Sequence, residues 1–475
     1  MRILHTADWH LGQHLFGISR QLEHQAFLDW LLDVLVREAV DALIIAGDIF
    51  DVSSPSPAAQ KQYYRFLAQC RATIPDLGIF VVGGNHDSPL RLDAPKEILD
   101  GLGIHVVGGL PHAPDGSVDL DRAIFPIWPR ASAASTPPEA QNEATPAGWL
   151  IAVPFLRPRD QLRRATAVAP TDSSPPVDLV TPRLGLGSRP PSDPHEDLVE
   201  QHRALYRALV DRAEERRVAG QPLVATGHLY MANTVLSELS ERKIQVGNQY
   251  ALPVDIFPDA LAYVALGHLH RAQTVADQAR IRYSGAPIPL SMAERHYEHQ
   301  VLIVDTDREH LKAVRPLRTP RSRDLLSVPD EHAPLESVLE ALRALPRPSS
   351  SDDPAASTPA AQPLLEVRVQ LDHAHPRLRR DIEAALEGAD VRLVRIDVRR
   401  PARNADSSLP EGRDLAVLSA VDVFRAAHQR ARGAPVPPDL MASFLALLSE
   451  VEAEMTANAS AEAPTKHVAD EVNTP

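Results

Sequence analysis

The chain has 475 residues, of which 44% are hydrophobic, so it can bury more than one core and we expect two or three domains. Its net charge of −14 argues against a broad DNA-coating surface, but not against nucleic acid bound at a local basic groove or through metal ions. Cys70 is the only cysteine, which excludes an internal disulfide and fits a reducing cytoplasm. We expect a cytoplasmic protein, because no signal peptide is visible and no apolar run approaches the ~18 residues of a membrane span.

Residues 1 to about 316 alternate strand-like and helix-like patterns. Short apolar runs bounded by glycine and polar residues predict buried strands at 2–4, 42–46, 79–82, 223–226 and 263–266. Helical periodicity predicts helices over 19–40 and 58–71, each of which would link two of these strands as a βαβ crossover does. Two stretches, about 128–148 and 166–195, are rich in proline and small residues, and we expect them to be flexible insertions.

The character of the chain changes after Leu317. Helices are predicted at residues 335–345 and 376–386, and strands at 365–371 and 391–398. Residues 317–403 are therefore expected to form a small α+β domain. Residues 404–456 are expected to carry a helix pair, whose first helix begins near the capping-box-like 419–422 and ends at Gly433 and Pro435. The second helix is predicted over 439–455, and a disordered tail over 457–475.

Five of the predicted strands are each followed by residues that bind metals or transfer protons. The motifs are Asp8-Trp9-His10, Gly47-Asp48-Ile49-Phe50-Asp51, Gly84-Asn85-His86-Asp87, Gly227-His228 and Gly267-His268-Leu269-His270. Each motif alone is unspecific. Because ligands gathered at strand ends can meet at one place, all five in this order predict a metal centre built from more than half of the sequence.

The donor set of these motifs favours two metal ions. It has seven oxygen or nitrogen donors and no thiolate: Asp8, His10, Asp48, Asn85, His228, His268 and His270. A structural zinc site usually has four ligands, often with cysteine. Seven donors fit two ions that share one carboxylate, and ions about 3.5–4 Å apart are the geometry used for phosphoester hydrolysis. Mixed carboxylate, amide and imidazole ligation suits Mn²⁺, with Fe or Zn as alternatives.

His86 lies between the candidate ligand Asn85 and the carboxylate of Asp87. A carboxylate beside an imidazole can fix its tautomer and raise its pKa, so we expect Asp87 to orient His86. His86 would then act as a general acid for the leaving alkoxide, or as a cation opposite the charge of the transition state. The other histidines, such as His105, His195 and His299, are interpreted as surface or core residues.

These motifs resemble those of the calcineurin-like metallophosphoesterase superfamily and, more closely, of its SbcD family of nuclease subunits. The similar segments include residues 1–12, 23–32, 154–160, 263–273 and 283–291, and the resemblance covers nearly the whole chain except the insertions and the tail. It implies an α/β fold, with a metallophosphoesterase β-sandwich flanked by helices, a small α+β capping domain and a C-terminal helix pair. The capping domain would help to orient DNA, and the helix pair would dock on an SbcC-type ATPase.

The resemblance also implies a division of the ligands. Asp8, His10, Asp48 and His270 would hold one ion, and Asp48, Asn85, His228 and His268 the other, with His86 as the catalytic histidine. It implies a nuclease with two divalent ions, most typically Mn²⁺, that acts as a 3′→5′ exonuclease on double-stranded DNA, as a single-strand endonuclease and in hairpin opening. The protein is expected to act in DNA repair, recombination and replication, as part of a heterotetramer of two nuclease and two ATPase chains. No association with a membrane is expected. Asp51 departs from archaeal relatives, which carry a second catalytic histidine there.

Two alternatives remain open at the level of the sequence. One is a phosphatase or cyclic-nucleotide phosphodiesterase on the same scaffold, although Val52-Ser53-Ser54 replaces the Arg-Gly that protein Ser/Thr phosphatases carry. The other is a non-catalytic scaffold for the ATPase, against which the complete ligand set argues. Four arginines either contact DNA phosphates or form a solvated cluster: Arg157, Arg159, Arg163 and Arg164.

Overall fold

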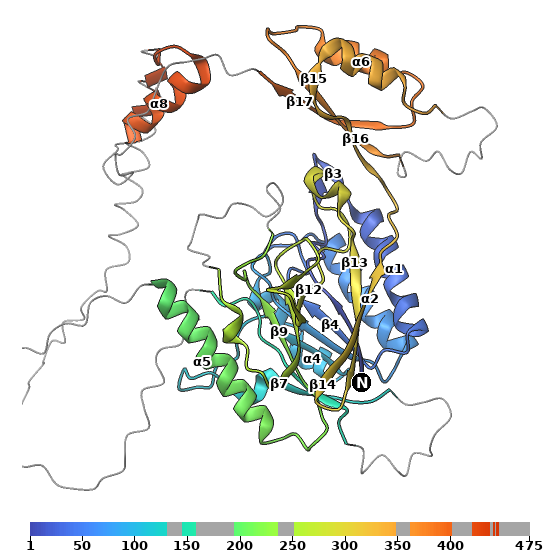
Figure 1. The fold of residues 1–475 in the computed structure, drawn as a ribbon, viewed down its shortest axis with the longest axis vertical. Helices are drawn as coiled ribbons and strands as arrows, with labels where there is room; N and C mark the ends of the chain where they lie inside the picture. Colours follow the sequence, from blue (N-terminus) through green and yellow to red (C-terminus); the bar gives the residue numbers. More distant parts are fainter. Residues whose placement is uncertain are drawn as a thin grey trace, which may run out of the picture. The chain divides into compact units, whose positions relative to one another are not determined.

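The structure is a computed structural model that describes residues 1–130, 145–157, 194–235, 251–347, 362–400, 420–437, 440–441 and 443–445. It divides into two compact units, Met1–Arg399 and Arg400–Pro475 (Figure 1). The predicted insertions lie largely outside the described residues, and the predicted tail lies wholly outside them.

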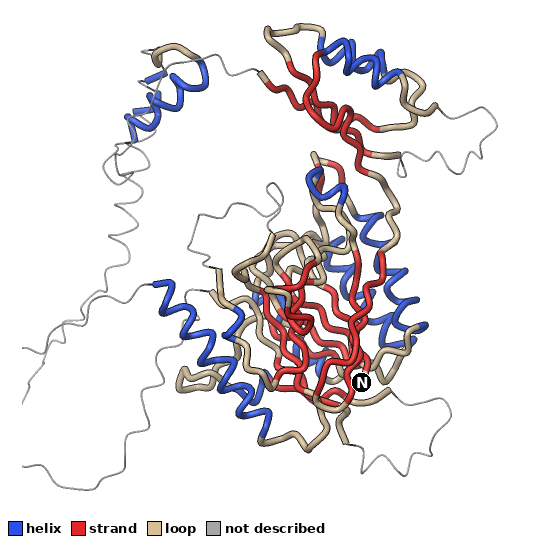
Figure 2. Tube along the Cα trace, in the orientation of Figure 1, coloured by secondary structure: helices blue, strands red, loops and turns tan. Residues whose placement is uncertain are grey.

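The first unit contains a sandwich of two six-stranded sheets, drawn in red in Figure 2. One sheet has the order β14 (His310–Arg318), β13 (Gln300–Asp307), β1 (Arg2–Thr6), β4 (Ala42–Ala46), β5 (Gly78–Val82) and β6 (Ile104–Val107). The other has the order β11 (Gln273–Val275), β12 (Gln278–Tyr283), β10 (Leu261–Gly267), β9 (Leu223–His228), β8 (Gly148–Ile151) and β7 (Ile124–Ile127). All five strands that the sequence predicts are therefore present.

A layer of buried apolar side chains lies between the two sheets. Ile3, Ile44 and Phe80 of the first sheet are buried in one cluster with Val224 and Tyr263 of the second. Alternation along a strand places successive side chains on opposite faces. This is why Leu43 and Ile45, on either side of Ile44, belong to a different cluster that contains the helices.

Helices cover the outer faces of both sheets. α1 (Gln21–Arg37) and α2 (Pro57–Thr73) bury one side against the first sheet, and α5 (Pro194–Glu214) buries one side against the second. α1 and α2 lie within three residues of their predicted bounds, and Cys70 of α2 is buried. Short helices α3 (Pro89–Asp93) and α4 (Lys96–Asp100) follow β5, and the hairpin of β2 (His14–Leu15) and β3 (Ile18–Ser19) precedes α1.

The predicted α+β domain forms a separate three-stranded parallel sheet, β15 (Leu325–Pro334), β16 (Leu364–Gln370) and β17 (Arg392–Arg399). α6 (Leu335–Arg343) and α7 (Leu378–Ala385) pack on it through a core of its own, which includes Val338, Val367 and Ile382. Four of these five elements match the predicted helices and strands to within two residues at each end.

The second unit contains α8 (Ala420–Arg432), which ends before Gly433 as the sequence predicts. Gly433 has a φ of 65°, a left-handed conformation that commonly terminates helices. In the second predicted helix, the described residues 440–441 and 443–445 are helical. The ring of Phe444 stacks on the ring of Phe424, with 4.0 Å between the ring centroids. Among the described residues, no helix is long and apolar enough to cross a membrane.

Candidate metal centre

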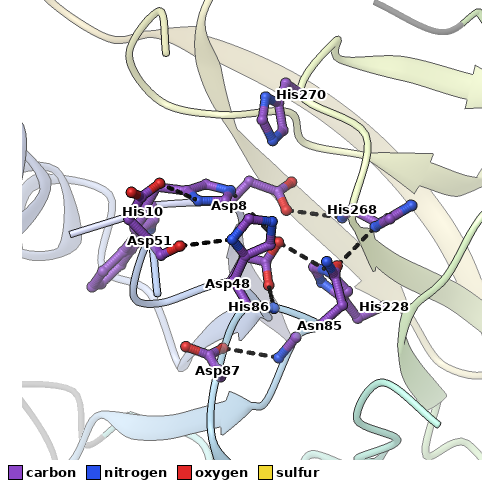
Figure 3. A network of polar contacts seen from close by, with 12 residues as sticks. Asp8, His10, Asp48, Asp51, Asn85, His86, Asp87, His228, His268 and His270 are labelled. Atoms are coloured by element: carbon purple, nitrogen blue, oxygen red, sulfur yellow. Dashed lines mark hydrogen bonds and ion pairs between the residues drawn. The ribbon is translucent and has the colours of Figure 1, made fainter. Parts of the chain in front are cut away.

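The two sheets bring the five ligand-bearing motifs to one edge of the sandwich. β1, β4 and β5 run parallel, so the segments after them, which carry Asp8, Asp48 and Asn85, leave the first sheet at the same end. In the second sheet β9 ends at His228, and His268 directly follows the parallel strand β10. Figure 3 shows these side chains around one common space together with His10, His86 and His270.

Four of the candidate ligands have a backbone conformation that residues other than glycine rarely adopt. The φ angle is 55° at Asp8, 48° at His10, 49° at Asp48 and 103° at His268. Neighbouring groups hold these turns, since the N–H of Asp8 donates to the Gly47 carbonyl at 3.0 Å and the N–H of His268 donates to Asp8 Oδ1 at 2.9 Å. Such strain typically occurs at functional sites, because the surrounding structure has to impose it.

The ligand atoms lie at distances that one or two ions could span. His228 Nε2 is 2.9 Å from Asn85 Oδ1 and 3.3 Å from Asp48 Oδ2, and His268 Nδ1 is 3.0 Å from the same Asn85 oxygen. Three groups have ligand atoms within 4.8 Å of one another: Asp8 with His10 and His270, Asp8 with Asp48 and His228, and His10 with Asp48 and His86. Among these groups of described residues, Asp8, His10 and Asp48 each belong to two.

The charges and unmet hydrogen bonds of the cluster fit a bound cation. Asp8 and Asp48 are almost fully buried, and in the described part of the chain Asp8 Oδ2 has no hydrogen-bond partner. A buried carboxylate oxygen without a partner is costly unless a cation or a donor reaches it. Burial alone would lower the pKa of His228, but the charges of Asp48 and Asp8 raise it to about 9, so the protein groups themselves favour positive charge at this point.

His86 is oriented differently from our expectation. Its Nδ1 donates to the backbone carbonyl of Asp51 at 2.7 Å, which fixes the proton on Nδ1. The expectation that Asp87 orients His86 is wrong, because the Asp87 carboxylate accepts the backbone N–H groups of Ile49, Phe50 and Gly84. Adjacent residues of this turn point to opposite sides, so Asp87 ties the loop after β5 to the loop after β4.

Comparison with known proteins agrees with this arrangement. A family model described as calcineurin-like phosphoesterase matches residues 1–136, and one described as type 5 capsule protein repressor C-terminal domain matches residues 321–432. The chain is 38% identical to the SbcD subunit of the SbcCD nuclease of Rhodobacter capsulatus over 90% of this chain and 94% of that protein. The chain belongs to the SbcD family. The SbcD subunits of Escherichia coli K12 and Bacillus subtilis 168 are 31% and 29% identical, over 89% and 96% of this chain and 92% and 99% of their own lengths.

Membership of the SbcD family confirms the expected fold class and makes the chain a metal-dependent nuclease with a calcineurin-like phosphoesterase domain. The calcineurin-like phosphoesterase domain also implies that the chain binds divalent metal, and the described residues contain groups that could hold it. Family membership therefore favours the nuclease over the phosphatase and non-catalytic alternatives.

Three contacts behind the histidines of this SbcD-family site were not predicted from the sequence, although the Asp51 residue itself was noted. Asp51 Oδ1 lies 3.3 Å from Nδ1 of His10, and Glu294 Oε1 lies 3.1 Å from Nδ1 of His270. Nδ1 of His228 donates to the Ala46 carbonyl at 2.9 Å. Burial would raise the pKa of Glu294, but His270 lowers it to about 2, so the carboxylate is ionised. Nothing in the spacing of Glu294 signals this contact, which depends on how the segment after β12 folds back on the motif after β10.

Glycines allow the strands of the centre to approach closely. A Cβ on Gly47 would lie 2.1 Å from His228 Nδ1, one on Gly84 would lie 2.2 Å from Asp48 Oδ1, and one on Gly267 would lie 1.9 Å from the Ala46 carbonyl oxygen. Each is far below a normal contact distance, so no larger residue fits without moving a candidate ligand or the backbone behind one.

The Arg157 side chain hydrogen-bonds to backbone carbonyl groups of the protein. Its Nη2 donates to the carbonyl of Asp87 at 2.6 Å and to that of Gly84 at 3.2 Å, so it clamps the loop that carries His86. The other three arginines of this group, at 159, 163 and 164, lie outside the described residues, so both interpretations of them stay open. His299 is a buried core residue that bonds the Ala286 carbonyl, while His105 and His195 are partly exposed, in agreement with their interpretation as surface or core residues.

Proposed function

We propose that this chain hydrolyses phosphodiester bonds in DNA with two divalent metal ions, for which Mn²⁺ is the proposed species. One ion is assigned to Asp8, His10, Asp48 and His270, and the other to Asp48, Asn85, His228 and His268. The supporting observation is the convergence of all seven side chains on one buried space, in which Asp48 Oδ2 lies 3.5 Å from His10 Nε2 and 3.3 Å from His228 Nε2. Asp48 therefore lies between the two proposed sets.

The bound ions would hold the phosphate, lower the pKa of a water between them and stabilise the leaving oxygen. The protein's own part is to fix the ligands and to supply a proton donor. His86 is proposed as the catalytic histidine, since its Nδ1–H is engaged by the Asp51 carbonyl and its backbone N–H donates to Asp48 Oδ1 at 2.9 Å. This leaves its Nε2 as the atom to meet a leaving alkoxide.

The finer activity follows from the family. We assign the chain 3′→5′ exonuclease activity on double-stranded DNA, single-strand endonuclease activity and hairpin opening, in DNA repair, recombination and replication. The relatives are named as subunits of SbcCD, so the proposed partner is an SbcC-type ATPase, in an assembly of two nuclease and two ATPase chains in the cytoplasm.

Separate parts of the chain are proposed to contact DNA and the ATPase. The three-stranded parallel domain, residues 317–403, is the proposed capping domain that orients DNA. The segment 404–456 is the proposed ATPase-binding segment, since α8 is a short helix and isolated helices of this length are marginal in water. Within it Phe424 and Phe444 stack, and Leu440 is exposed, so the pair offers apolar surface to a groove.

Substitution of the shared carboxylate tests the proposed chemistry. Asp48→Ala should lose both ions and all Mn²⁺-dependent cleavage of single-stranded DNA, because its carboxylate serves both sites. Asp259→Ala is the matched control, since the Asp259 side chain is exposed and pairs with Arg280, which is not a candidate ligand. Full metal content and activity in Asp48→Ala would refute the two-ion assignment. Comparison of single-stranded DNA with a small chromogenic phosphodiester tests the substrate, for which DNA should be preferred.

A further inference from the structure

The histidines of the two proposed metal sites have different partners. His10 and His270 belong to one group with Asp8, and each has a carboxylate near Nδ1. Nδ1 of His270 is hydrogen-bonded to Glu294 Oε1 at 3.1 Å. Asp51 Oδ1 lies 3.3 Å from Nδ1 of His10, but within the described residues that nitrogen forms no hydrogen bond. In the other proposed metal site, Nδ1 of His228 donates a hydrogen bond to the Ala46 carbonyl. His268 turns its Nδ1 toward the Asn85 side chain, and within the described residues no carboxylate lies at its other nitrogen.

The fold fixes the carboxylate of Glu294 and the backbone of Asp51. Glu294 is fully buried, its Oε2 accepts the N–H of Leu290 at 2.9 Å, and its Oε1 also accepts the Ser291 hydroxyl at 3.3 Å. Asp51 is about one-third exposed, and its backbone is fixed because its N–H donates to the Leu11 carbonyl at 3.2 Å. Neither carboxylate belongs to the groups of ligand atoms, so each acts through a histidine.

A carboxylate at Nδ1 affects metal binding in two ways. A hydrogen-bonded carboxylate, such as that of Glu294 at His270, keeps the proton on Nδ1 so that Nε2 carries the lone pair, and its negative charge makes that nitrogen a stronger donor. Asp51 acts on His10 through its negative charge alone. A carbonyl also selects the tautomer, but it contributes only a dipole. Loss of such an outer partner typically lowers metal affinity by ~10–100-fold.

We propose that Asp51 and Glu294 are positioning residues that make the Asp8–His10–His270 site the tighter of the two metal sites. One ion therefore binds there first and is retained, and the ion at Asn85, His228 and His268 binds more weakly and exchanges. This inference rests on the two-ion site of the proposed function and adds the order in which it fills.

Titration of the metal-free, full-length chain with Mn²⁺ tests the order. Calorimetry should resolve two binding steps, and electron paramagnetic resonance at one equivalent should show an isolated ion, with spin coupling only at two equivalents. Asp51→Asn and Glu294→Gln should each weaken the first step by ~10-fold or more and leave the second within about threefold. His268→Ala is the matched counterpart, because it should weaken only the second step.

The outcomes separate this inference from the function beneath it. Unchanged affinities in both carboxylate variants, or equal weakening of both steps, would overturn the proposed order. A wild-type chain that binds one ion or none would instead overturn the two-ion function. If Glu294→Gln fails to fold, as its melting curve without metal would reveal, the partly exposed Asp51→Asn decides the question alone.

Discussion

Gly84→Ala is a small change that should disable the centre. The added Cβ would lie 2.2 Å from Asp48 Oδ1 and 2.3 Å from its backbone nitrogen. Asp48 cannot retreat easily, because it is buried and its Oδ1 accepts the His86 N–H at 2.9 Å. The loop that carries Asn85 and His86 must therefore move, by about 1 Å if the contact is to approach the ordinary 3.4 Å.

Two magnitudes follow from this displacement. Overpacking of this kind typically costs about 1–3 kcal/mol of unfolding free energy, which leaves the protein folded. A misplacement of about 1 Å at reacting groups can cost ~10²-fold in turnover, and here it also moves the proposed ligand Asn85. The variant should fold, bind less metal and cleave DNA ~10²-fold more slowly.

Metal analysis, thermal melting and Mn²⁺-dependent cleavage of single-stranded DNA measure the three effects. Gly101→Ala is the control, since its Cβ would meet nothing closer than 3.5 Å, and it should match the wild type in all three. If Gly84→Ala retained wild-type metal content and turnover, the tight contact between this loop and Asp48 would not be a requirement of the site.

Three further predictions concern chemistry, pH and assembly. His86→Ala should keep both metals and DNA affinity while turnover falls ~10²-fold or more, and loss of metal would make His86 a ligand instead. Burial lowers the pKa of His5 from 6.5 to about 3. The unfolded chain therefore binds a proton at His5 at a higher pH than the folded chain does, and the free energy of unfolding decreases as the pH falls from 6.5 toward 3. Between pH 7 and pH 5, His5 should lower the free energy of unfolding by about 2 kcal/mol. Urea unfolding should show this decrease in the wild type, and the decrease should be about 2 kcal/mol smaller in His5→Phe. Removal of residues 413–475 should abolish pull-down by an SbcC-type ATPase but spare Mn²⁺-dependent cleavage, and continued binding would refute the docking role.

The elements around the centre were predictable because their patterns are local. A strand such as β4 is buried on both faces and forms an unbroken apolar run, and α1 shows its helical spacing within a few turns. The seven donors were visible for the same reason, since each lies within a few residues of the end of such a run. Edge strands such as β7 and β11 were not specified, because they are short and only partly buried.

The contacts behind the donors were not predictable, since they arise from tertiary structure. Glu294 reaches His270 across 24 residues, and Asp51 reaches His10 across the whole segment from β2 to β4. Sequence adjacency was misleading at Asp87, which the turn directs away from His86 and toward backbone N–H groups.

The most direct test of the two-ion centre is a crystal structure of the Mn²⁺-loaded protein with an anomalous difference map. The account predicts two peaks about 3.5–4 Å apart, one beside His10 and His270 and the other beside His228 and His268, with the Asp48 carboxylate touching both. A single peak, or a pair of peaks that Asp48 does not bridge, would contradict it.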